Sequence, residues 1–379
     1  MKIAFDAKRA AQNRTGLGNY SRFILHCFSM YGKKENQYIL YIPNLKKVSL
    51  LNGLINHPSF FIRSPHFLWK KFKSLWRIWD IPSDLNKQQI NIYHGLSNEL
   101  PLNIHKAKSV KSIVTIHDLI FLHFPQYYKP IDRIIYNYKF RKACENADRI
   151  IAVSECTKRD IINYYHIQPQ KIDVVYQGCD NIFSHIQSQA IKEKILSKYQ
   201  IKKPYILSVG SIEERKNLLL LARALKLLPE DIHVVAIGKR TPYEIKIEKF
   251  LQNENMKERF RIINNVPYTD LPALYQSASI FVYPSRFEGF GIPMLEALNS
   301  GIPAIGCTGS CLEEAGGPHS IYVSPDDEKE LARTIQQILN NKDLSKKMII
   351  EGKVYAQKFN DNKLYLDLVN SYKKALEKE

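Results

Sequence analysis

Two carboxylates and a glycine turn are the residues of this sequence best suited to do chemistry. Glu288 and Glu296 have seven residues between them, and the first is followed by the turn Gly289-Phe290-Gly291. The glycines let backbone N–H groups approach a ligand closely. A helix beginning beside them favours an anionic or hydroxyl-rich ligand, because a helix N-terminus carries partial positive charge. The segment therefore predicts a site for such a ligand.

The elements around the two glutamates must hold them at one edge of a sheet. The apolar run 280–283 is typical of a buried parallel strand, and 294–298 predicts a helix with Pro293 in its first turn. Glu288 then follows the carboxyl end of a strand, where open α/β sheets bind ligands. Glu296 lies about one turn into the helix, near the same end of the sheet.

This strand, turn and helix resemble the paired-glutamate motif of retaining glycosyltransferases with the GT-B architecture, and of family four in particular. The resemblance implies that Glu288 contacts hydroxyls of the donor sugar and that Glu296 holds the nucleotide ribose. The residues implied to hold the sugar beside Glu288 are Gly289, Phe290 and Gly291. The alternative is a structural Rossmann element whose glutamates cap a helix or face solvent.

Two cations lie just before another predicted helix, which begins near residue 217. Arg215 and Lys216 follow a strand and Gly210, and two cations at a helix N-terminus can bind a diphosphate. The stretch 210–217 resembles the diphosphate-binding loop of the family, except that Ser211 stands where some members carry Arg. Either Arg215 and Lys216 suffice or another residue supplies the charge. A solvated basic turn is the alternative interpretation.

A histidine ends the strand 112–116 in the first half of the chain. His117 and Asp118 resemble the His-Asp strand end of the family, which implies that His117 faces the donor sugar across the cleft between the domains. A histidine at the carboxyl end of a parallel strand can bond a ligand hydroxyl. The alternative is a structural histidine bonded to a backbone carbonyl. We expect Asp118 to fix a loop or to orient His117.

Two further segments carry weaker signals. Gly16 and Gly18 lie in a predicted loop after the first strand, and by resemblance this loop sits under the donor diphosphate. The Gly-x-Gly spacing by itself is common in tight turns. The stretch 264–266, ending at Val266, resembles the loop whose backbone meets the nucleotide base.

The implied chemistry needs neither a metal nor a cofactor. The chain contains no Asp-x-Asp sequence, the motif that chelates a metal in the other major glycosyltransferase fold. Arg215 and Lys216 fit charge neutralisation by side chains instead. The expected catalytic residues are His117, Glu288, Arg215 and Lys216.

The alternation of strands and helices predicts two doubly wound parallel sheets. At 379 residues the chain is long enough for two domains with separate cores. We expect two Rossmann-like domains facing a cleft and a C-terminal helix that crosses back to the first domain. The expected parts are an acceptor-side domain 1–177, a linker 178–203, a nucleotide-sugar domain 204–355 and the returning helix 356–379.

The positive charge is concentrated in the first half. Residues 1–175 hold 27 of the 55 Lys and Arg but only 12 of the 37 Asp and Glu. Such a surface attracts nucleic acid, an anionic membrane or a phosphorylated substrate, although an AT-rich genome produces the same bias. Because no nucleic-acid-binding motif accompanies the charge, we do not expect a nucleic acid partner.

All three tryptophans lie in the segment 68–79, where apolar residues at helical spacing alternate with lysines. The pattern suits a helix on an anionic membrane surface, or an ordinary helix packed on its domain. The six scattered cysteines, and the lack of a signal peptide or an apolar run of about 18 residues, predict a cytoplasmic protein. We expect it to lie peripherally on the inner face of the plasma membrane.

The whole pattern predicts a transferase of sugars. The resemblance implies transfer of a hexose, with retention of anomeric configuration, from a GDP- or UDP-linked sugar to a glycan or lipid-linked acceptor. The stretch 214–217 suggests the mannosyltransferase-like subgroup of surface polysaccharide assembly. The rival interpretations are a nucleotide-sugar epimerase, a phosphorylase relative and a non-catalytic nucleic-acid-binding protein.

Overall fold

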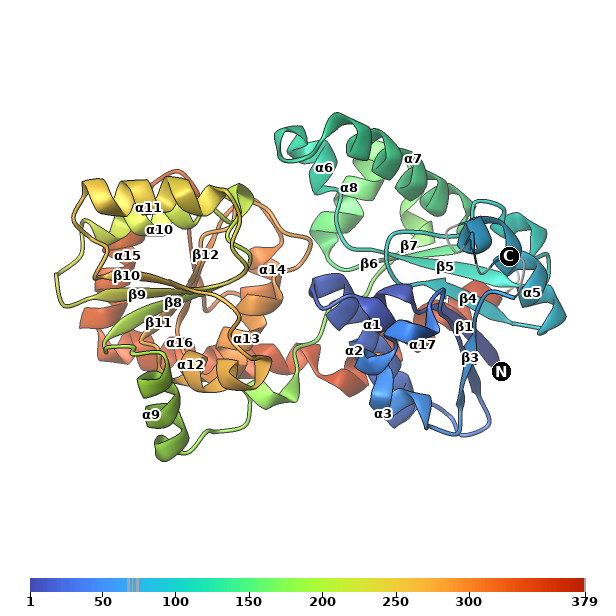
Figure 1. Cartoon of the computed structure of the whole chain (residues 1–379), viewed down its shortest axis with the longest axis horizontal. Coiled ribbons are helices and arrows are strands. Elements are labelled where there is room, and N and C mark those ends of the chain that lie inside the picture. The colour runs from blue at the N-terminus through green and yellow to red at the C-terminus, as the bar shows by residue number, and fades with distance from the viewer. Residues whose placement is uncertain (67–68, 70, 73–74, 378–379) are drawn as a thin grey trace. The chain divides into compact units, whose positions relative to one another are not determined.

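The computed structural model describes residues 1–377 except 67–68, 70 and 73–74. The chain forms two compact units. Unit 1 comprises Met1–Gly178 and Asp361–Glu379, and unit 2 comprises Cys179–Asn360. Each unit is a parallel sheet covered by helices on both faces, which confirms the predicted pair of doubly wound α/β domains (Figure 1).

Unit 1 contains a seven-stranded parallel sheet in the order β3-β2-β1-β4-β5-β6-β7. The strand order reverses direction between β1 and β4, which is the switch point at which such sheets bind ligands. The strands are β1 (Lys2–Asp6), β2 (Gln37–Tyr41), β3 (Phe60–Arg63), β4 (Ile92–Gly95), β5 (Lys111–Ile116), β6 (Arg149–Ala152) and β7 (Ile172–Val174).

Alternating residues of these strands build cores on both faces of the sheet. Ile3 and Phe5 belong to the core that includes residues of α2 and α17, whereas Val114 and Ile116 join Phe140 of α7 on the other face. Figure 1 shows α6, α7 and α8 on one face and α1, α2 and α17 on the other. The helices are α1 (Lys8–Gln12), α2 (Gly16–Tyr31), α3 (Asn52–Ile55), α5 (Ile81–Lys87), α6 (Ile120–His123), α7 (Pro130–Asn146), α8 (Glu155–Tyr165) and α17 (Asp361–Leu376).

The last helix of the chain is part of unit 1. The Tyr372 hydroxyl of α17 lies 2.6 Å from Nδ1 of the buried His94 on β4. Ser371 and Lys374 donate to the carboxylate of Asp173 on β7, at 2.9 and 2.8 Å. Helix α17 therefore contributes both apolar and polar contacts to the fold of this unit.

Unit 2 contains a six-stranded parallel sheet in the order β10-β9-β8-β11-β12-β13, with its switch point between β8 and β11. The strands are β8 (Tyr205–Val209), β9 (His233–Ile237), β10 (Phe260–Ile263), β11 (Ile280–Tyr283), β12 (Ala304–Cys307) and β13 (Ile321–Val323). The helices are α9 (Gln189–Lys198), α10 (Leu218–Leu225), α11 (Tyr243–Asn253), α12 (Leu271–Ser277), α13 (Ile292–Ser300), α14 (Leu312–Gly316), α15 (Glu328–Asn340) and α16 (Lys342–Ala356).

The boundary between the units differs from the expected linker. Residues 179–203 belong to unit 2, because α9 packs against α12 and its Lys198 pairs with Asp270 at 2.6 Å. The expected returning helix 356–379 corresponds to α17, which begins at Asp361, after the chain passes from unit 2 to unit 1 at Asn360.

The predicted loop with Gly16 and Gly18 is instead the first turn of α2. Asn13 accepts hydrogen bonds from Thr15 and so fixes the residue before the helix. A Cβ on Gly18 would lie 1.9 Å from the carbonyl oxygen of Asn13. Gly18 therefore serves a close backbone approach at the helix start.

The segment 68–79 lies partly outside the described residues. In its described part, the chain forms one π-helical turn, η4 (Trp76–Asp80). Trp76 is 2% exposed and its ring lies 5.9 Å from that of Tyr41, whereas Trp79 is 51% exposed. Trp76 therefore fills the core of unit 1, which matches the alternative of a helix packed on its domain, whereas Trp79 faces solvent.

Candidate active site

The candidate site lies at the switch point of unit 2. The loop that begins at Gly210 follows β8, and the loop that contains Glu288 follows β11. These two strands are neighbours in a parallel sheet, so both loops leave the same edge. The sheet therefore places Arg215, Lys216 and Glu288 together although Lys216 and Glu288 are 72 positions apart in the sequence.

Glycines let the first loop lie close to the sheet. Gly210 has φ of +157° and donates its N–H to Ile237 at 2.9 Å. A Cβ on Gly238, at the end of β9, would lie 1.7 Å from the Gly210 carbonyl oxygen. After one 3₁₀ turn, η9 (Glu214–Lys216), Asn217 adopts a left-handed conformation and begins α10.

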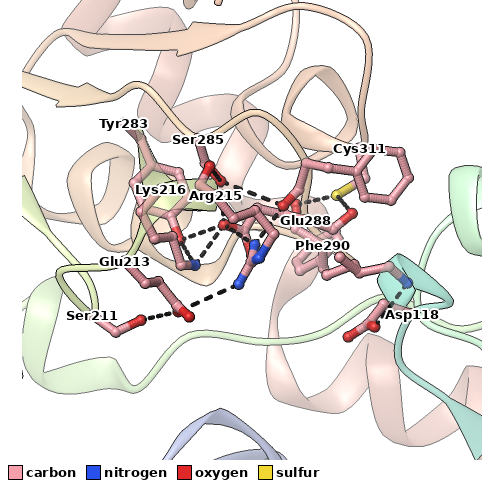
Figure 2. A network of polar contacts seen from close by, with 12 residues as sticks. Asp118, Ser211, Glu213, Arg215, Lys216, Tyr283, Ser285, Glu288, Phe290 and Cys311 are labelled. Carbon is pink, nitrogen blue, oxygen red and sulfur yellow. Dashed lines mark hydrogen bonds and ion pairs between the residues drawn. The ribbon is translucent and has the colours of Figure 1, made fainter. Parts of the chain in front are cut away.

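The carboxylate of Glu288 is the centre of a polar cluster (Figure 2). Its Oε1 lies 2.5 Å from Nζ of Lys216 and 2.9 Å from Nη1 of Arg215. Ser285 and Tyr283 donate their hydroxyls to the same oxygen at 2.5 and 3.1 Å. Charged and neutral donors together satisfy a carboxylate that is only 9% exposed.

The charges in this cluster are strongly coupled. Burial alone would raise the pKa of Glu288, but Arg215, Lys216 and the hydrogen bonds to it lower that pKa to about 2. Burial raises the pKa of Tyr283 well above its ordinary value, so this hydroxyl stays protonated and donates. Two buried cations face one buried carboxylate, Glu288. A second carboxylate, Glu213, lies 3.6 Å from Arg215 but is 44% exposed and pairs weakly, so the buried part of the cluster favours an anionic ligand.

Backbone contacts tie the two loops together. Arg286 donates its N–H to the carbonyl of Arg215 at 2.9 Å, and the Arg215 guanidinium donates to the carbonyl of Phe287 at 2.5 Å. The Cys311 thiol donates to the carbonyls of Glu288 and Phe290 at 3.0 and 2.9 Å. The loops therefore hold the cations in place before any ligand arrives.

The Gly-Phe-Gly turn connects Glu288 to α13. Phe290 packs its ring 5.5 Å from that of Phe359, so its side chain is part of the core of unit 2. Gly291 has φ of +112°, and a Cβ there would lie 2.7 Å from Leu312. Only glycine suits that position, and the turn brings the N-terminus of α13 beside Glu288.

Glu296 lies on α13 and makes a different contact. The Tyr275 hydroxyl of α12 donates to its Oε2 at 2.7 Å. Burial raises the pKa of Glu296 to about 7; the Tyr275 bond opposes that rise, and Asp180 adds to it. One carboxylate is therefore a fixed anion, and the other changes protonation near neutral pH.

In unit 1, His117 is buried and bonded on both ring nitrogens. Its Nε2 lies 2.9 Å from the carbonyl of Leu96, and Gln177 lies 3.3 Å from its Nδ1. Burial lowers its pKa to about 4, so the ring is neutral at physiological pH. These contacts match the structural alternative, and the role toward a sugar remains a prediction. Asp118 accepts from the N–H of Ile120 at 3.2 Å, as expected of a residue that fixes a loop.

The remaining predicted residues belong to other elements than the Glu288 cluster. Val266 follows β10 at the outer edge of the sheet of unit 2, and Gly16 and Gly18 belong to unit 1. Among the described residues, no group of three His, Cys, Asp or Glu side chains could hold a metal ion.

Sequence reasoning missed several residues that complete the site. Tyr283 ends strand β11 and Ser285 follows that strand, so their place at the carboxyl end of a strand was a usable signal. No signal in the sequence pointed to Tyr275, because it lies on α12 whereas Glu296 lies on α13. Gly238 was visible as a strand end, but its contact with Gly210 depends on the pairing of β8 and β9.

Two family models together match most of the chain. Residues 191–355 match the model described as Glycosyl transferases group 1, and residues 26–181 match Glycosyltransferase Family 4. The first match includes both loops of the candidate site.

Individual proteins are similar over the whole length. O-antigen chain mannosyltransferase B of Escherichia coli is 27% identical over 98% of this chain and 100% of its own. A glycosyltransferase from Rickettsia africae superposes with a TM-score of 0.79 at 19% identity, covering 100% of this chain and 99% of the other. Anabaena Alr3699/HepE, solved with UDP and glucose, gives 0.76 at 15% identity, covering 99% and 100%.

Proposed function

Because the chain belongs to the family 4 glycosyltransferases, as a hexosyltransferase of the mannosyltransferase-like type with the GT-B fold, we propose that it uses a nucleoside-diphosphate sugar and retains anomeric configuration. The donor is a GDP- or UDP-linked hexose, with mannose as the expected sugar. The acceptor is a glycan or a lipid-linked glycan of surface polysaccharide biosynthesis.

The pairing of Glu288 with Arg215 and Lys216 at the β8–β11 switch point is the observation that carries the proposal. A diphosphate binding here meets two cations already held in place and the N-terminus of α13. Glu288 and the backbone of 289–291 then hold the sugar hydroxyls. Glu296 accepts from the ribose, and Val266 meets the base.

Arg215 and Lys216 stabilise the negative charge that develops as the diphosphate leaves. This supports transfer without a metal, since the site supplies its own cations. Glu288 is not the covalent nucleophile in this proposal, because its carboxylate is bonded to two cations and two hydroxyls. The diphosphate departs on the face that the acceptor hydroxyl attacks, which retains the configuration. His117 contacts a sugar hydroxyl, and Gly16 and Gly18 lie beneath the diphosphate.

The proposed place of action is the cytoplasm, at the inner face of the plasma membrane. All six cysteines, each of them among the described residues, are buried and none forms a disulfide, which suits a reducing compartment. In the part of the chain that the structure describes, no helix is long and apolar enough to cross a bilayer. In this proposal the chain reaches a lipid-linked acceptor from the membrane surface.

Product analysis tests the proposal. Purified protein is incubated with GDP-mannose, UDP-glucose, UDP-galactose or UDP-N-acetylglucosamine, a lipid-linked oligosaccharide, and either EDTA or Mg²⁺. We expect one donor to give a glycosidic product whose one-bond C1–H1 coupling shows the anomeric configuration of the donor, at the same rate with EDTA as with Mg²⁺. An inverted product, or transfer that EDTA abolishes, contradicts the mechanism. Release of free sugar as the sole product contradicts the transferase assignment.

A further inference from the structure

Helix α7 of unit 1 exposes a row of large apolar side chains. Ile131, Ile134, Ile135 and Tyr138 follow the spacing i, i+3, i+4 and i+7, which places them on one face of the helix. They are 61%, 67%, 42% and 55% exposed. We refer to these four residues as the outer stripe. Isolated exposed apolar residues are ordinary, but a continuous row on one face marks a binding surface.

The packing of unit 1 does not account for the outer stripe. The opposite face of α7 fills the core through Phe140, Ala143 and Cys144. Tyr136 stacks on Phe140 with ring centroids 5.8 Å apart. A helix that is apolar on both faces is normally buried on both, so the outer face of α7 has the composition of a contact surface.

Cations outnumber carboxylates around the outer stripe. The segment 129–142 contains five Lys and Arg and one carboxylate, Asp132. Arg141 and Lys142 share Glu145 at 3.0 and 2.7 Å, and Lys139 lies 3.4 Å from Glu99. Five cations therefore stand against three carboxylates, and Lys129 and Arg141 are exposed at either end of the row. Aliphatic side chains with a tyrosine and a rim of cations are the composition of a helix that lies in the interface of an anionic bilayer.

We propose that the outer face of α7 binds the surface of a bilayer that contains anionic lipid. The stripe inserts among the headgroups, and the cations at its ends meet the lipid phosphates. This inference rests on the proposed function, because membrane binding is useful to the enzyme if its acceptor is lipid-linked. An enzyme held at the bilayer and a lipid-linked acceptor then diffuse in the same plane. The docking surface differs from the predicted segment 68–79, whose Trp76 is in the core.

Vesicle sedimentation tests the inference on the full-length protein. The vesicles are phosphatidylcholine alone or with 30% phosphatidylglycerol, without nucleotide sugar or acceptor. The test variant is I131E/I134E. The matched control is I350E/V354E on α16, which places the same two charges at residues that are 64% and 69% exposed. Melting temperatures of both variants are measured, and we expect them to match wild type because all four side chains are exposed.

We expect wild type to bind the anionic vesicles, to bind pure phosphatidylcholine weakly, and to bind less at high salt. The I131E/I134E variant binds at least about tenfold more weakly, because it loses apolar insertion and gains repulsion from the lipid phosphates. The I350E/V354E control binds as wild type does. Equal binding by all three proteins overturns the inference. The inference is also overturned if the wild-type protein does not bind vesicles and instead self-associates through the outer stripe.

A soluble oligosaccharide acceptor separates this inference from the proposed function. The I131E/I134E variant is expected to transfer to it at the wild-type rate, because the stripe is not part of the site. Transfer to the soluble acceptor together with failed vesicle binding overturns only the docking surface. Vesicle binding without transfer to any acceptor leaves the docking surface standing and contradicts the proposed function.

Discussion

At the scale of single residues, Glu288 does two things that must be separated by experiment. Its carboxylate compensates two buried cations, and in the proposed mechanism it also contacts the sugar. Loss of a charge that compensates buried partners costs about 3 kcal/mol or more. A bound diphosphate can neutralise the two cations in place of Glu288, but it cannot replace the contact of Glu288 with the sugar.

Glu288→Gln should therefore lower kcat by about 100-fold while nucleoside diphosphate binds as well as to wild type or more tightly. The two unpaired cations gain a diphosphate as their partner, and the transition state loses its carboxylate contact. Steady-state kinetics and titration calorimetry measure the two effects.

Glu213→Gln is the control for the loss of one charge in the same loop. Glu213 is 3.6 Å from Arg215, but its side chain is 44% exposed, so its pairing contributes little. Its kcat should stay within about twofold of wild type. Wild-type turnover in Glu288→Gln would show that the carboxylate is not used in transfer.

The raised pKa of Glu296 gives a pH signature. The folded protein has a pKa of about 7 at this carboxyl, against an ordinary value of 4.5. Between these values the folded state holds a proton that the unfolded state has lost, so stability falls as pH rises. The fall is roughly 1.4 kcal/mol per pH unit in wild type relative to Glu296→Gln. Denaturant unfolding at pH 5, 6, 7 and 8 measures it.

Ribose hydroxyls that donate to Glu296 would favour its charged form. Nucleotide binding near pH 6 should then release a proton from wild type and none from Glu296→Gln. Calorimetry in buffers of different ionisation heat detects the release. Equal proton release from both proteins would mean that the ribose does not meet this carboxylate.

The sequence was sufficient to select Arg215, Lys216 and Glu288, because each lies just after an apolar strand. It could not identify Tyr275, which reaches Glu296 from another helix. It also could not give the state of His117, since the carbonyl of Leu96 and the amide of Gln177 are brought to it only by the fold.

At the scale of elements, α17 shows how a distant segment completes a domain. Its Tyr372 and Leu368 belong to the core under β1 and β4, and Tyr372 is 1% exposed. Its hydroxyl lies beside His94, whose pKa burial lowers to about 3. The helix follows unit 2 in sequence but stabilises unit 1.

Tyr372→Ala should destabilise unit 1 by about 3–5 kcal/mol, because it leaves a cavity and an unpartnered His94 nitrogen. Leu366→Ala on the same helix is the control, since Leu366 is 56% exposed and should change stability by less than about 0.5 kcal/mol. Chemical denaturation followed by circular dichroism compares them. Equal stabilities would contradict the assignment of α17 to the core of unit 1.

Elements with strong patterns were predictable and short ones were not. The predicted strand 280–283 is β11 as the structure has it, the predicted helix 294–298 lies within α13, and the predicted strand 112–116 lies within β5. Strand β3 was missed because its four residues, Phe60–Arg63, show neither alternation nor a long apolar run. Helix α11, Tyr243–Asn253, was missed because charged residues separate its buried Ile247 and Leu251.

At the scale of the whole molecule, the charge and the chemistry belong to different units. The excess of Lys and Arg lies in residues 1–175, within unit 1, which also carries the outer stripe of α7. The cluster of Arg215, Lys216 and Glu288 lies in unit 2. Unit 1 then has the surface expected of a domain that binds an acceptor at a membrane. Unit 2 has the cluster expected of a domain that binds a nucleoside-diphosphate donor.

The nucleotide-sugar site of unit 2 is tested most directly by a thermal-shift titration of the full-length protein. GDP-mannose, UDP-glucose, UDP-galactose, UDP-N-acetylglucosamine and the free nucleotides are added to wild type, Glu296→Ala and Glu313→Ala. Glu313 on α14 is the control because it is an exposed glutamate of the same unit.

We expect the ligands that carry one base to stabilise wild type, by about 2.7 kcal/mol at a hundred times Kd. The shift should persist in Glu313→Ala and shrink in Glu296→Ala. The absence of any shift with all these ligands, or an equal shift in all three proteins, would contradict a nucleotide-sugar site at the β8–β11 switch point.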